Sequence, residues 1–383
     1  MKDLVVISLE PWDEVWRRNQ HLVAGLMSRD PGLRVLFVEP SADPIHAASR
    51  GARPRRGRGL RPGPPSEDGG AGHGLWLLQP TKWLPRRVDR RADVRWARRI
   101  VAAASHLGFS RPLLWVNDPS GAEVLDLTGW PAVYDITDDW ILADRPPAEH
   151  ERLVRLDTTL LQRCEEVVVC SPGLVTSKGR ERDVTLVPNA VDVASYRLPR
   201  PRPDDLPEGP TAVYLGTVHR DRMDLALCIR TARELAATGA RLVLVGPTPL
   251  DATDRAALEE AGIVLVGAVH RDLVPGYLQH ADVLVVPHRV TPFTDSLDPI
   301  KLYEYRAVGR PVVATPVAGV RDRTDPRVVV ADSETFPSEV AARLPSTSVF
   351  PDGTGDDVPR WQDRVHLMAG VLDRLRAQAR LRA

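Results

Sequence analysis

Residues 298–315 have the sequence DPIKLYEYRAVGRPVVAT, which is the pattern of a helix that leads directly into a buried strand. Pro299 suits the first turn of a helix, where a backbone N–H is not needed, and Gly309 suits the position that ends one. The β-branched run after the glycine predicts the strand. A helix followed closely by a buried strand is the repeating element of α/β folds with parallel sheets.

Two charged side chains on this predicted helix suggest a ligand. Lys301 falls in the first turn, beside backbone N–H groups that favour an anion. Glu304 follows one turn later, close enough to accept hydrogen bonds from hydroxyl groups of whatever carries the anion. A phosphate next to a ribose would satisfy both side chains. The alternative is a capped surface helix on which both side chains lie in solvent.

The same alternation of short apolar runs with longer amphipathic stretches extends through the whole chain and predicts an α/β protein. In the first half we expect helices at about 17–28, 88–107 and 148–164, and strands at Leu4–Ile7, Val35–Val38, Leu75–Leu78, Leu113–Val116, Ala132–Tyr134, Val167–Cys170 and Val184–Val187. In the second half we expect helices near 223–237, 252–261, 272–280 and 301–308, and strands at Ala212–Leu215, Leu242–Val245, Val264–Val266, Val283–Pro287, Val312–Ala314 and Val328–Val330.

The segment Leu198–Pro210 marks a boundary, because five prolines within thirteen residues favour an extended linker over a helix or a central strand. A chain of 383 residues also exceeds what one hydrophobic core usually organises. We therefore predict two Rossmann-like domains, residues 1–198 and 210–345, with a cleft between them. Apolar residues at helical spacing near the C-terminus predict a further helix, 360–383, that docks on one of these domains.

Composition excludes several classes of protein. The formal net charge is zero, so no global charge argues for nucleic acid. Three widely spaced cysteines indicate neither a zinc site nor a disulfide framework, which fits a reducing cytosol. No apolar stretch approaches the ~20 residues that cross a bilayer, and the first apolar run is predicted to be a strand rather than a signal peptide. We expect a cytoplasmic protein, and peripheral contact with the inner face of the membrane stays open.

The stretch Ser49–Gly74 is dense in Gly, Pro and Arg and lacks apolar periodicity, so we expect a mobile loop. Its six arginines, from Arg50 to Arg61, could meet phosphates, an anionic lipid-linked acceptor or a membrane surface. The other interpretation is a solvated insertion without a ligand.

A basic turn follows the strand expected at 212–215. Gly216 lets the backbone approach a ligand closely, and an arginine beyond it can neutralise a diphosphate with two hydrogen bonds. Arg220 and Arg222 are the candidates. A solvated turn is the alternative for both.

The string PIKLYEYRAVGRPVVATPV, residues 299–317, resembles the sugar-nucleotide segment of retaining family-4 (group 1) glycosyltransferases of the GT-B fold, in the variant that resembles teichuronic acid biosynthesis glycosyltransferases. The segment Pro188–Asp192 (PNAVD) is similar to the Pro-Asn-Gly-Val-Asp signature of that family. The resemblance implies two Rossmann-like domains around a cleft, with the C-terminal helix crossing back to the N-terminal domain.

This resemblance assigns roles to residues around the predicted helix. The family carries two glutamates eight positions apart, and Glu304 matches the second, which contacts the ribose. Ser296 stands where the first, which faces the donor sugar, is expected. Asp298 and Ser296 are therefore the candidates for the donor-sugar contact. Lys301 and Arg220, with Arg222 as the alternative, would stabilise the leaving diphosphate, and the loop near Val269 would contact the base through its backbone.

The first half adds a second set of candidates. Asp135, Asp138 and Asp139 follow a predicted strand and could bind a metal, but lysine and arginine beside the predicted diphosphate can replace a cation, so we expect no metal. The resemblance implies that these aspartates line the cleft toward the acceptor or the donor sugar. Arg18 and His21 open the first helix, where the resemblance implies a loop facing the transferred phosphate. A packed position on the helix is the alternative for His21.

We therefore expect a hexosyltransferase-type glycosyltransferase that moves a sugar from a nucleotide-diphosphate sugar to a hydroxyl acceptor, with retention and without cofactor or metal, in cell-surface glycan or natural-product glycoside synthesis. The acceptor, lipid-linked or glycan, stays open. A catalytically silent sugar-nucleotide-binding subunit and a GT-B-fold sugar-nucleotide epimerase are the alternatives. A dinucleotide-dependent oxidoreductase is disfavoured, because neither half opens with Gly-x-Gly-x-x-Gly.

Overall fold

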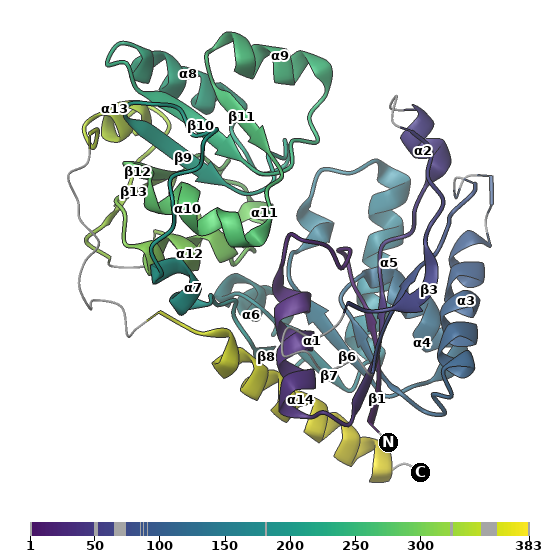
Figure 1. Ribbon diagram of the computed structural model, residues 1–383. Coiled ribbons are helices and arrows are strands. Elements are labelled where there is room, and N and C mark those ends of the chain that lie inside the picture. Colours follow the sequence, from purple (N-terminus) through teal and green to yellow (C-terminus); the bar gives the residue numbers. More distant parts are fainter. Residues whose placement is uncertain are drawn as a thin grey trace.

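The computed structural model describes residues 2–49, 53–64, 74–84, 86, 88–89, 91–180, 182–321, 325–345 and 358–381. Its strands form two sheets, one of eight strands and one of six, and helices lie on both faces of each (Figure 1). The eight-stranded sheet lies within residues 2–186 and the six-stranded sheet within residues 211–330. The predicted α/β class with two parallel-sheet halves is confirmed. The domain limits 1–198 and 210–345 stay predictions.

The N-terminal sheet has the order β3-β4-β2-β1-β5-β6-β7-β8. All neighbours pair in parallel except β3 and β4, which are antiparallel. Its strands are β1 (Lys2–Ile7), β2 (Leu33–Val38), β3 (Gly59–Pro62), β4 (Leu75–Gln79), β5 (Leu113–Val116), β6 (Ala132–Ile136), β7 (Glu166–Val169) and β8 (Thr185–Leu186). Its helices are α1 (Arg18–Arg29), α2 (Pro44–Ser49), α3 (Ala92–His106), α4 (Ala122–Thr128), α5 (Pro147–Arg163) and α6 (Pro172–Lys178), with short 3-10 turns at Pro119–Gly121 and Trp140–Leu142.

The C-terminal sheet has the order β11-β10-β9-β12-β13-β14, and every pair is parallel. Its strands are β9 (Thr211–Leu215), β10 (Arg241–Val245), β11 (Val264–Gly267), β12 (Val283–Val286), β13 (Val312–Ala314) and β14 (Val328–Val330). The helices of this half are α7 (Val193–Arg197), α8 (Leu225–Ala236), α9 (Ala252–Glu260), α10 (Val274–Gln279), α11 (Pro292–Asp295), α12 (Ile300–Val308) and α13 (Phe336–Ala341), with a 3-10 turn at Arg271–Leu273.

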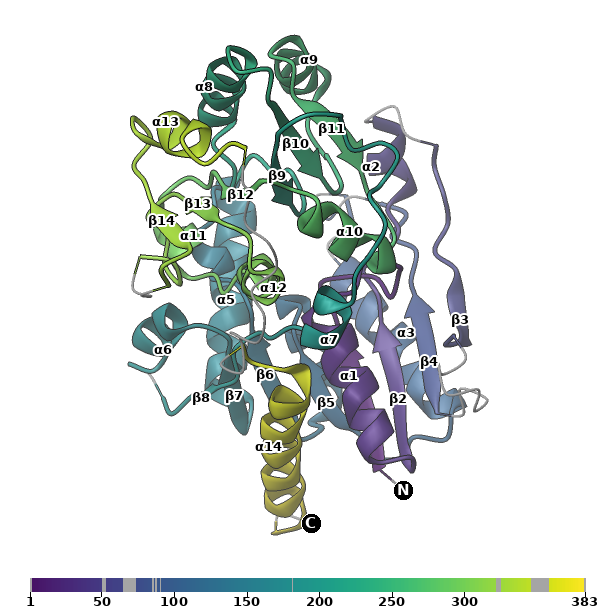
Figure 2. The same cartoon turned by 60° about the vertical axis from the view of Figure 1, so that its left-hand side comes forward.

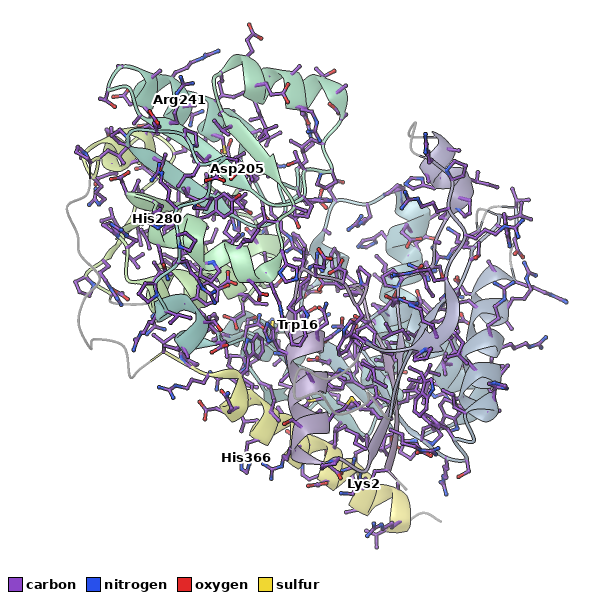
Figure 3. All side chains as sticks on the ribbon, in the orientation of Figure 1. Lys2, Trp16, Asp205, Arg241, His280 and His366 are labelled. Atoms are coloured by element: carbon purple, nitrogen blue, oxygen red, sulfur yellow. The ribbon has the colours of Figure 1, made fainter. Side chains whose placement is uncertain are left out.

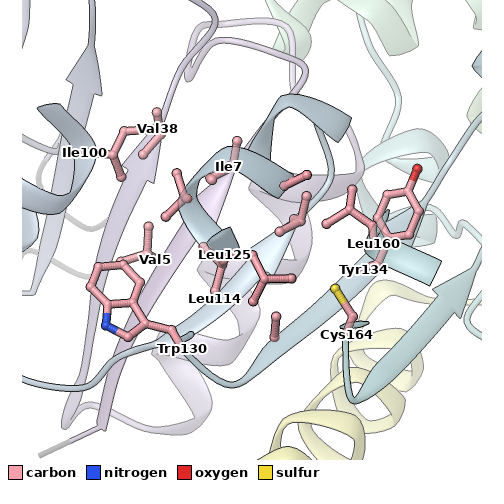
Figure 4. Close-up of a cluster of buried hydrophobic side chains, with 14 of the residues drawn as sticks. Val5, Ile7, Val38, Ile100, Leu114, Leu125, Trp130, Tyr134, Leu160 and Cys164 are labelled. Atoms are coloured by element: carbon pink, nitrogen blue, oxygen red, sulfur yellow. The ribbon is translucent and has the colours of Figure 1, made fainter. Parts of the chain in front are cut away.

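The predicted helix of the opening stretch is confirmed as α12. It begins directly after Pro299 and ends before Gly309, whose φ of 79° lies in the left-handed region that glycine adopts without strain. Strand β13 follows three residues later. The central strands have no exposed face because helices cover both sides, which is why they appear in the sequence as unbroken apolar runs. Figure 4 shows one such buried cluster between the N-terminal sheet and its helices.

The expectation of a loop throughout Ser49–Gly74 is wrong for Gly59–Pro62, which form the edge strand β3. Leu60 packs against the core beside β4, and the guanidinium of Arg61 lies 2.7 Å from the buried carboxylate of Glu39. A short edge strand needs only one paired side, so it can form from a sequence rich in glycine and arginine. Residues 50–52 and 65–73 of this stretch lie outside the described residues.

The final helix, α14 (Trp361–Leu381), returns to the N-terminal half and lies along α1, as Figures 1 and 2 show and as the resemblance implied. Val365, Met368 and Leu372 are buried against the face of the sheet that α1 also covers. Gly25 of α1 allows the close approach, because a Cβ there would collide with Val365. In the part of the chain that the structure describes, no helix is long and apolar enough to span a bilayer.

We expect Leu372→Ala to lower the free energy of unfolding by about 2–5 kcal/mol, because it leaves a cavity under α14. The matched control is Leu367→Ala on the same helix, where 40% of the side chain is exposed and the expected change is below about 0.5 kcal/mol. Urea unfolding followed by circular dichroism measures both. Equal effects of the two substitutions would contradict the docking of α14.

Candidate functional site

Three neighbouring strands of the C-terminal sheet end in a glycine, and together these residues form what we call the glycine edge: Gly216 after β9, Gly246 after β10 and Gly267 at the end of β11. Their φ angles are 128°, 139° and 86°, a region that other residues rarely adopt. The backbones are in direct contact, because the N–H of Gly246 donates to the carbonyl of Gly267 at 2.7 Å and a Cβ on Gly246 would collide with the carbonyl of Gly216. A ligand can therefore approach bare backbone at the carboxyl end of the sheet, where open α/β sheets bind ligands.

Lys301 lies over this edge. A Cβ added to Gly216 would stand 3.0 Å from the Cε of Lys301. The Nζ atom of Lys301 lies 2.8 Å from the hydroxyl oxygen of Tyr214, 3.2 Å from Nε2 of His288 and 4.3 Å from the centre of the Tyr214 ring. The ammonium group is thus held by neutral partners rather than by a carboxylate.

Burial, together with the positive charge of Arg222, lowers the pKa of Lys301 to about 7, and the carboxylate of Glu304 opposes both effects. Burial, together with the charges of Lys301 and Arg222, also holds the pKa of His288 well below its ordinary value. The imidazole is therefore neutral near pH 7, and its Nε2 can accept a hydrogen bond from the ammonium group. An anion bound here would favour the charged form of Lys301 and raise its pKa again.

Glu304 stands one turn further along α12, where the hydroxyl of Tyr196 on α7 donates a hydrogen bond to its carboxylate. Burial raises the pKa of Glu304 to about 6, although the Tyr196 hydrogen bond and Lys301 both favour the ionised form. At pH 7 the carboxylate is mostly ionised and can accept hydrogen bonds from ligand hydroxyls. Lys301 and Glu304 thus place a cation and an acceptor on one helix beside the glycine edge.

Of the two candidate arginines, the structure brings Arg222 to this cluster and leaves Arg220 outside it. Arg222 lies 3.2 Å from a carboxylate oxygen of Asp138, and its charge acts on Lys301 and His288. Arg220 is exposed and forms an ion pair with Asp254 on α9. The preference for Arg220 as the diphosphate contact therefore has less support than the alternative, Arg222.

Ser296 and Asp298 are both bound by the N-terminal half. The carboxylate of Asp298 accepts from the backbone N–H of Asn189 at 2.7 Å and from the hydroxyl of Tyr303 at 2.8 Å. The hydroxyl oxygen of Ser296 accepts from the backbone N–H of Asp139 at 3.1 Å. Both side chains are buried at the junction, where these hydrogen bonds join the two halves, and their contact with a donor sugar stays a prediction.

The three aspartates of the first half point to three different cations. Asp135 pairs with Arg18 at 3.0 Å, Asp138 with Arg222 at 3.2 Å, and Asp139 with Lys178 at 3.1 Å. The three carboxylates therefore do not converge on one position. Of the three, Asp138 is the one that borders the cluster around Lys301.

Arg18 and His21 also form contacts within the protein. Arg18 is buried, and its guanidinium binds both oxygens of Asp135 and the side-chain oxygen of Asn189. Burial alone would lower the pKa of Arg18, but the paired Asp135 raises it above its ordinary value. His21 stacks on Trp361 of α14 with ring centres 4.6 Å apart, and burial, together with the charge of Arg271, lowers its pKa to about 3. The packed alternative for His21 is therefore favoured over contact with a phosphate.

Val269 lies two residues beyond the glycine edge and is partly buried, so its backbone borders the same edge. Close by, the guanidinium of Arg271 lies 3.9 Å above the ring of Trp16 from the N-terminal half, and Figure 3 shows Trp16 at the junction of the two halves. The glycine edge therefore faces the N-terminal half across this junction.

Two groups of contributing residues escaped the analysis of the sequence. His288 and Gly246 each follow a buried strand, so their positions at the carboxyl end of the sheet were signals that could have found them. Tyr214 and Tyr196 carried no such signal. In the sequence, a tyrosine that only packs in the core cannot be distinguished from one whose hydroxyl contacts a lysine or a glutamate.

The architecture defines the class of the molecule: two parallel-sheet halves whose carboxyl edges meet are the GT-B fold of glycosyltransferases. A sucrose-phosphate synthase from Thermosynechococcus elongatus superimposes with a TM-score of 0.72 and 18% identity over 99% of this chain and 100% of that one. The catalytic domain of starch synthase IV from Arabidopsis thaliana, bound to ADP and acarbose, gives 0.61 and 12% over 98% and 99%. A structure from E. coli, described as trehalose-6-phosphate bound with UDP-2-fluoro glucose, gives 0.61 and 12% over 98% and 95%.

Residues 209–344, which hold the glycine edge, Lys301 and Glu304, match the family described as Glycosyl transferases group 1. The C-terminal half is therefore similar to the domain that this family shares. The chain is also 26% identical over 221 residues to a protein of Bacillus subtilis (strain 168) whose assignment as a teichuronic acid biosynthesis glycosyltransferase, TuaH, is itself provisional. That match covers 54% of this chain and about half, 55%, of the relative.

The unusual pKa of Lys301 can be measured directly, because the chain has only four lysines. After reductive methylation with ¹³C-formaldehyde, we expect the signal that Lys301→Arg removes to titrate near pH 7 and to shift to higher pH with pyrophosphate. Its proton is lost as pH rises through the lowered pKa, so pyrophosphate should bind more weakly at pH 8.5 than at pH 6. The internal control is Lys178: burial alone would lower its pKa, but the paired Asp157 and Asp139 raise that pKa above its ordinary value. A Lys301 signal that still carries its proton at pH 9 would contradict the prediction.

Proposed function

We propose that this protein is a glycosyltransferase that moves a sugar from a nucleotide-diphosphate sugar to a hydroxyl acceptor, with retention at the transferred carbon and without a metal. One observation carries the proposal: Lys301 and Glu304 stand on one helix beside a glycine edge of bare backbone. A diphosphate beside a ribose matches this arrangement of a cation and a hydrogen-bond acceptor.

In the proposed complex, the diphosphate lies over the glycine edge between Lys301 and Arg222. The ribose hydroxyls donate to Glu304, and the base lies against the backbone near Val269. Two solved structures of the same fold are described with UDP-2-fluoro glucose and with ADP, which supports a nucleoside diphosphate sugar as the donor here.

During transfer, the bond between the anomeric carbon and the diphosphate oxygen breaks while the acceptor oxygen bonds to that carbon. The acceptor proton passes to the leaving diphosphate. Negative charge grows on the diphosphate, and cations already fixed in a partly buried site stabilise it more than they stabilise the ground state. Lys301 and Arg222 supply this charge in place of a metal.

If transfer proceeds with retention, the state of the nearby carboxylates bears on which route it takes. Asp135 and Asp139 are paired with Arg18 and Lys178, and Asp298 is bound by Asn189 and Tyr303. None of these three is placed to act as a nucleophile, so we propose that the acceptor attacks on the face that the diphosphate leaves.

A catalytically silent sugar-nucleotide-binding subunit is the second candidate, and Ser296 is the observation that favours it. The donor-sugar side has a buried serine where the family pattern has a glutamate, so the sugar would be bound with fewer contacts. The presence of Lys301, Glu304 and Arg222 supports the active enzyme. The Bacillus relative, about half of which the match covers, is described as a teichuronic acid biosynthesis glycosyltransferase, and this supports a cell-surface glycan as the context. A hexosyl group as the transferred sugar is part of our proposal.

The purified protein should bind at least one sugar nucleotide from a panel of UDP-, GDP- and dTDP-sugars and hydrolyse it slowly without acceptor. Isothermal calorimetry measures binding, and chromatography of the released nucleoside diphosphate measures hydrolysis. Absence of binding to every member would exclude the enzyme, and binding without turnover on lipid-linked and glycan acceptors would favour the silent subunit.

Arg222→Ala should lower the turnover of that donor by about 10- to 100-fold, because it removes a cation from the leaving diphosphate. Arg220→Ala is the same chemical change two residues away, and with its side chain paired to Asp254 it should change turnover by less than about twofold. Melting curves of both variants control for folding, because Arg222 also contacts Asp138. A larger loss for Arg220→Ala would restore Arg220 as the diphosphate contact.

A further inference from the structure

Three polar atoms from different elements meet at the carboxyl ends of β9 and β12, which are neighbouring strands of the C-terminal sheet (Figure 1). Tyr214 belongs to β9, His288 follows β12 by two residues, and Lys301 extends from α12. The Nζ atom of Lys301 lies 2.8 Å from the hydroxyl oxygen of Tyr214 and 3.2 Å from Nε2 of His288. The hydroxyl oxygen and Nε2 are 3.3 Å apart. The ammonium group therefore has a defined place in a triangle of hydrogen-bonding groups.

The backbone of His288 is fixed by contacts with two other segments. The hydroxyl of Thr315, directly after β13, donates to the carbonyl oxygen of His288 at 2.7 Å. Met223 and His288 form an antiparallel bridge, and the N–H of Arg289 donates to the carbonyl oxygen of Arg222 at 2.8 Å. His288 is also only 2% exposed, so its ring has little freedom to move. The backbone that carries His288 is thus attached to the turn that carries Arg222.

The contacts of the two ring nitrogens favour a neutral imidazole on His288. The ammonium group of Lys301 can only donate, so Nε2 acts as the acceptor and the ring proton is assigned to Nδ1. Nδ1 is buried and has no hydrogen-bond partner within the described part of the chain. An imidazolium would place a second positive charge beside the ammonium group, in a buried position where neither ring N–H has an acceptor, and this is costly. Burial, together with the charges of Lys301 and Arg222, also holds the pKa of His288 well below its ordinary value.

The charged groups around Lys301 come from the turn after β9 and from α12. Burial and then the charge of Arg222 lower the pKa of Lys301, and Glu304 opposes them. Each of these two side chains has a further partner, because Arg222 pairs with Asp138 of the N-terminal half and Glu304 accepts from the hydroxyl of Tyr196 on α7. The charge of Lys301 is therefore set by burial, by one cation and by one carboxylate that is already hydrogen-bonded.

The tyrosines near this cluster are uncharged near pH 7. Burial raises the pKa of Tyr214 and holds that of Tyr305 on α12 well above its ordinary value. The hydroxyl of Tyr305 is bound to the sheet, since it accepts from the N–H of Leu215 and donates to the carbonyl of Val285. Tyr214 and His288 are thus the neutral acceptors that contact Lys301 directly.

A neutral acceptor has a specific advantage at an anion site. A hydrogen bond to the ammonium form favours that form, as a carboxylate partner would also do. A carboxylate, however, would cancel the positive charge that a phosphate needs, whereas an imidazole leaves that charge available. His288 therefore stabilises Lys301 as a cation without neutralising it.

We propose that His288 is a positioning residue, whose neutral Nε2 atom holds the ammonium group of Lys301 over Gly216 so that this group meets the diphosphate. Because the backbone of His288 is bridged to the turn that carries Arg222, the two cations keep a fixed spacing. The role toward the diphosphate rests on the proposed function, whereas the contact between His288 and Lys301 does not.

His288→Phe tests the positioning, because it keeps a buried ring and removes the acceptor. Loss of one hydrogen bond to a charged group should move the titration midpoint of Lys301 from about 7 to lower pH, by about one pH unit. His288→Gln, whose amide oxygen can accept in place of Nε2, should bring the midpoint back toward the wild-type value. NMR of protein labelled with ¹³C in its four lysines measures the midpoint, and Lys301→Arg assigns the signal.

The same substitution should change how pyrophosphate binding depends on pH. The ammonium form binds the anion and is lost as pH rises through the pKa of Lys301, so a lower pKa moves the loss of binding to lower pH. Calorimetry should show His288→Phe binding about five- to tenfold more weakly than the wild type at pH 7.5, but less than about threefold more weakly at pH 5.5. The matched control is His280→Phe in the same half, where the ring nitrogen lies 2.8 Å from the carbonyl oxygen of Arg200. This control should bind as the wild type does at both pH values.

The proposal is overturned if the Lys301 midpoint is unchanged in His288→Phe, or if His288→Gln shifts it as far as His288→Phe does. Weakening by the same factor at both pH values would also overturn it, because that is the result of a general loss of structure. A protein whose Lys301 midpoint follows His288 but which binds no sugar nucleotide would keep the positioning and lose the proposed transfer. A protein that turns over a donor with a Lys301 midpoint independent of His288 would keep the transfer and lose the positioning.

Discussion

The position of the candidate site depends on a buried ion pair between Arg18 of α1 and Asp135 of β6. Arg18 also binds the side chain of Asn189, and the backbone of Asn189 donates to Asp298, which in turn accepts from Tyr303 of α12. Hydrogen bonds therefore run without a break from the N-terminal sheet to the helix that carries Lys301 and Glu304. Breaking a buried pair by removing one partner is strongly destabilising, so this network gives the two halves one preferred relation.

At the proposed donor site, the positive charges are not balanced by nearby carboxylates. His288 is buried and Lys301 is partly buried beside Arg222. Among the described residues, the carboxylate that raises the pKa of Lys301 is Glu304, which itself has a raised pKa. A desolvated cation without a close counter-ion is costly, and a bound diphosphate would remove that cost. The same feature makes the affinity for the diphosphate dependent on pH near neutrality. The partly buried charge of Lys301 thus lowers the stability of the free protein and favours binding of the diphosphate, as is common at functional sites.

Several residues that spacing and resemblance assign to the substrate also form contacts that hold the protein together. Arg18, Asp135 and Asp298 are polar and lie in or next to regular elements that border the junction, and these properties are shared by ligand contacts and by buried structural pairs. Arg18 pairs with Asp135 and Asn189, and Asp298 with Asn189, each more than a hundred residues away in the sequence, so no local pattern could distinguish the two roles. Arg220 and Arg222 show the same limit, because a two-residue difference in one turn decides which arginine meets Asp254 and which meets the site.

The sequence by itself determined the α/β class, the helix from Ile300 to Val308 and its glycine end, and the positions of Lys301 and Glu304 one turn apart. Those features follow from local periodicity, from the fixed φ of proline and from the freedom of glycine, which act over a few neighbouring residues. Only the tertiary structure decided that α14 lies on α1, that β3 pairs at the edge of the sheet, and that Tyr214, His288 and Tyr196 surround the charged pair. These contacts join residues distant in the chain, and their energies depend on packing and burial that exist only once both sheets have formed.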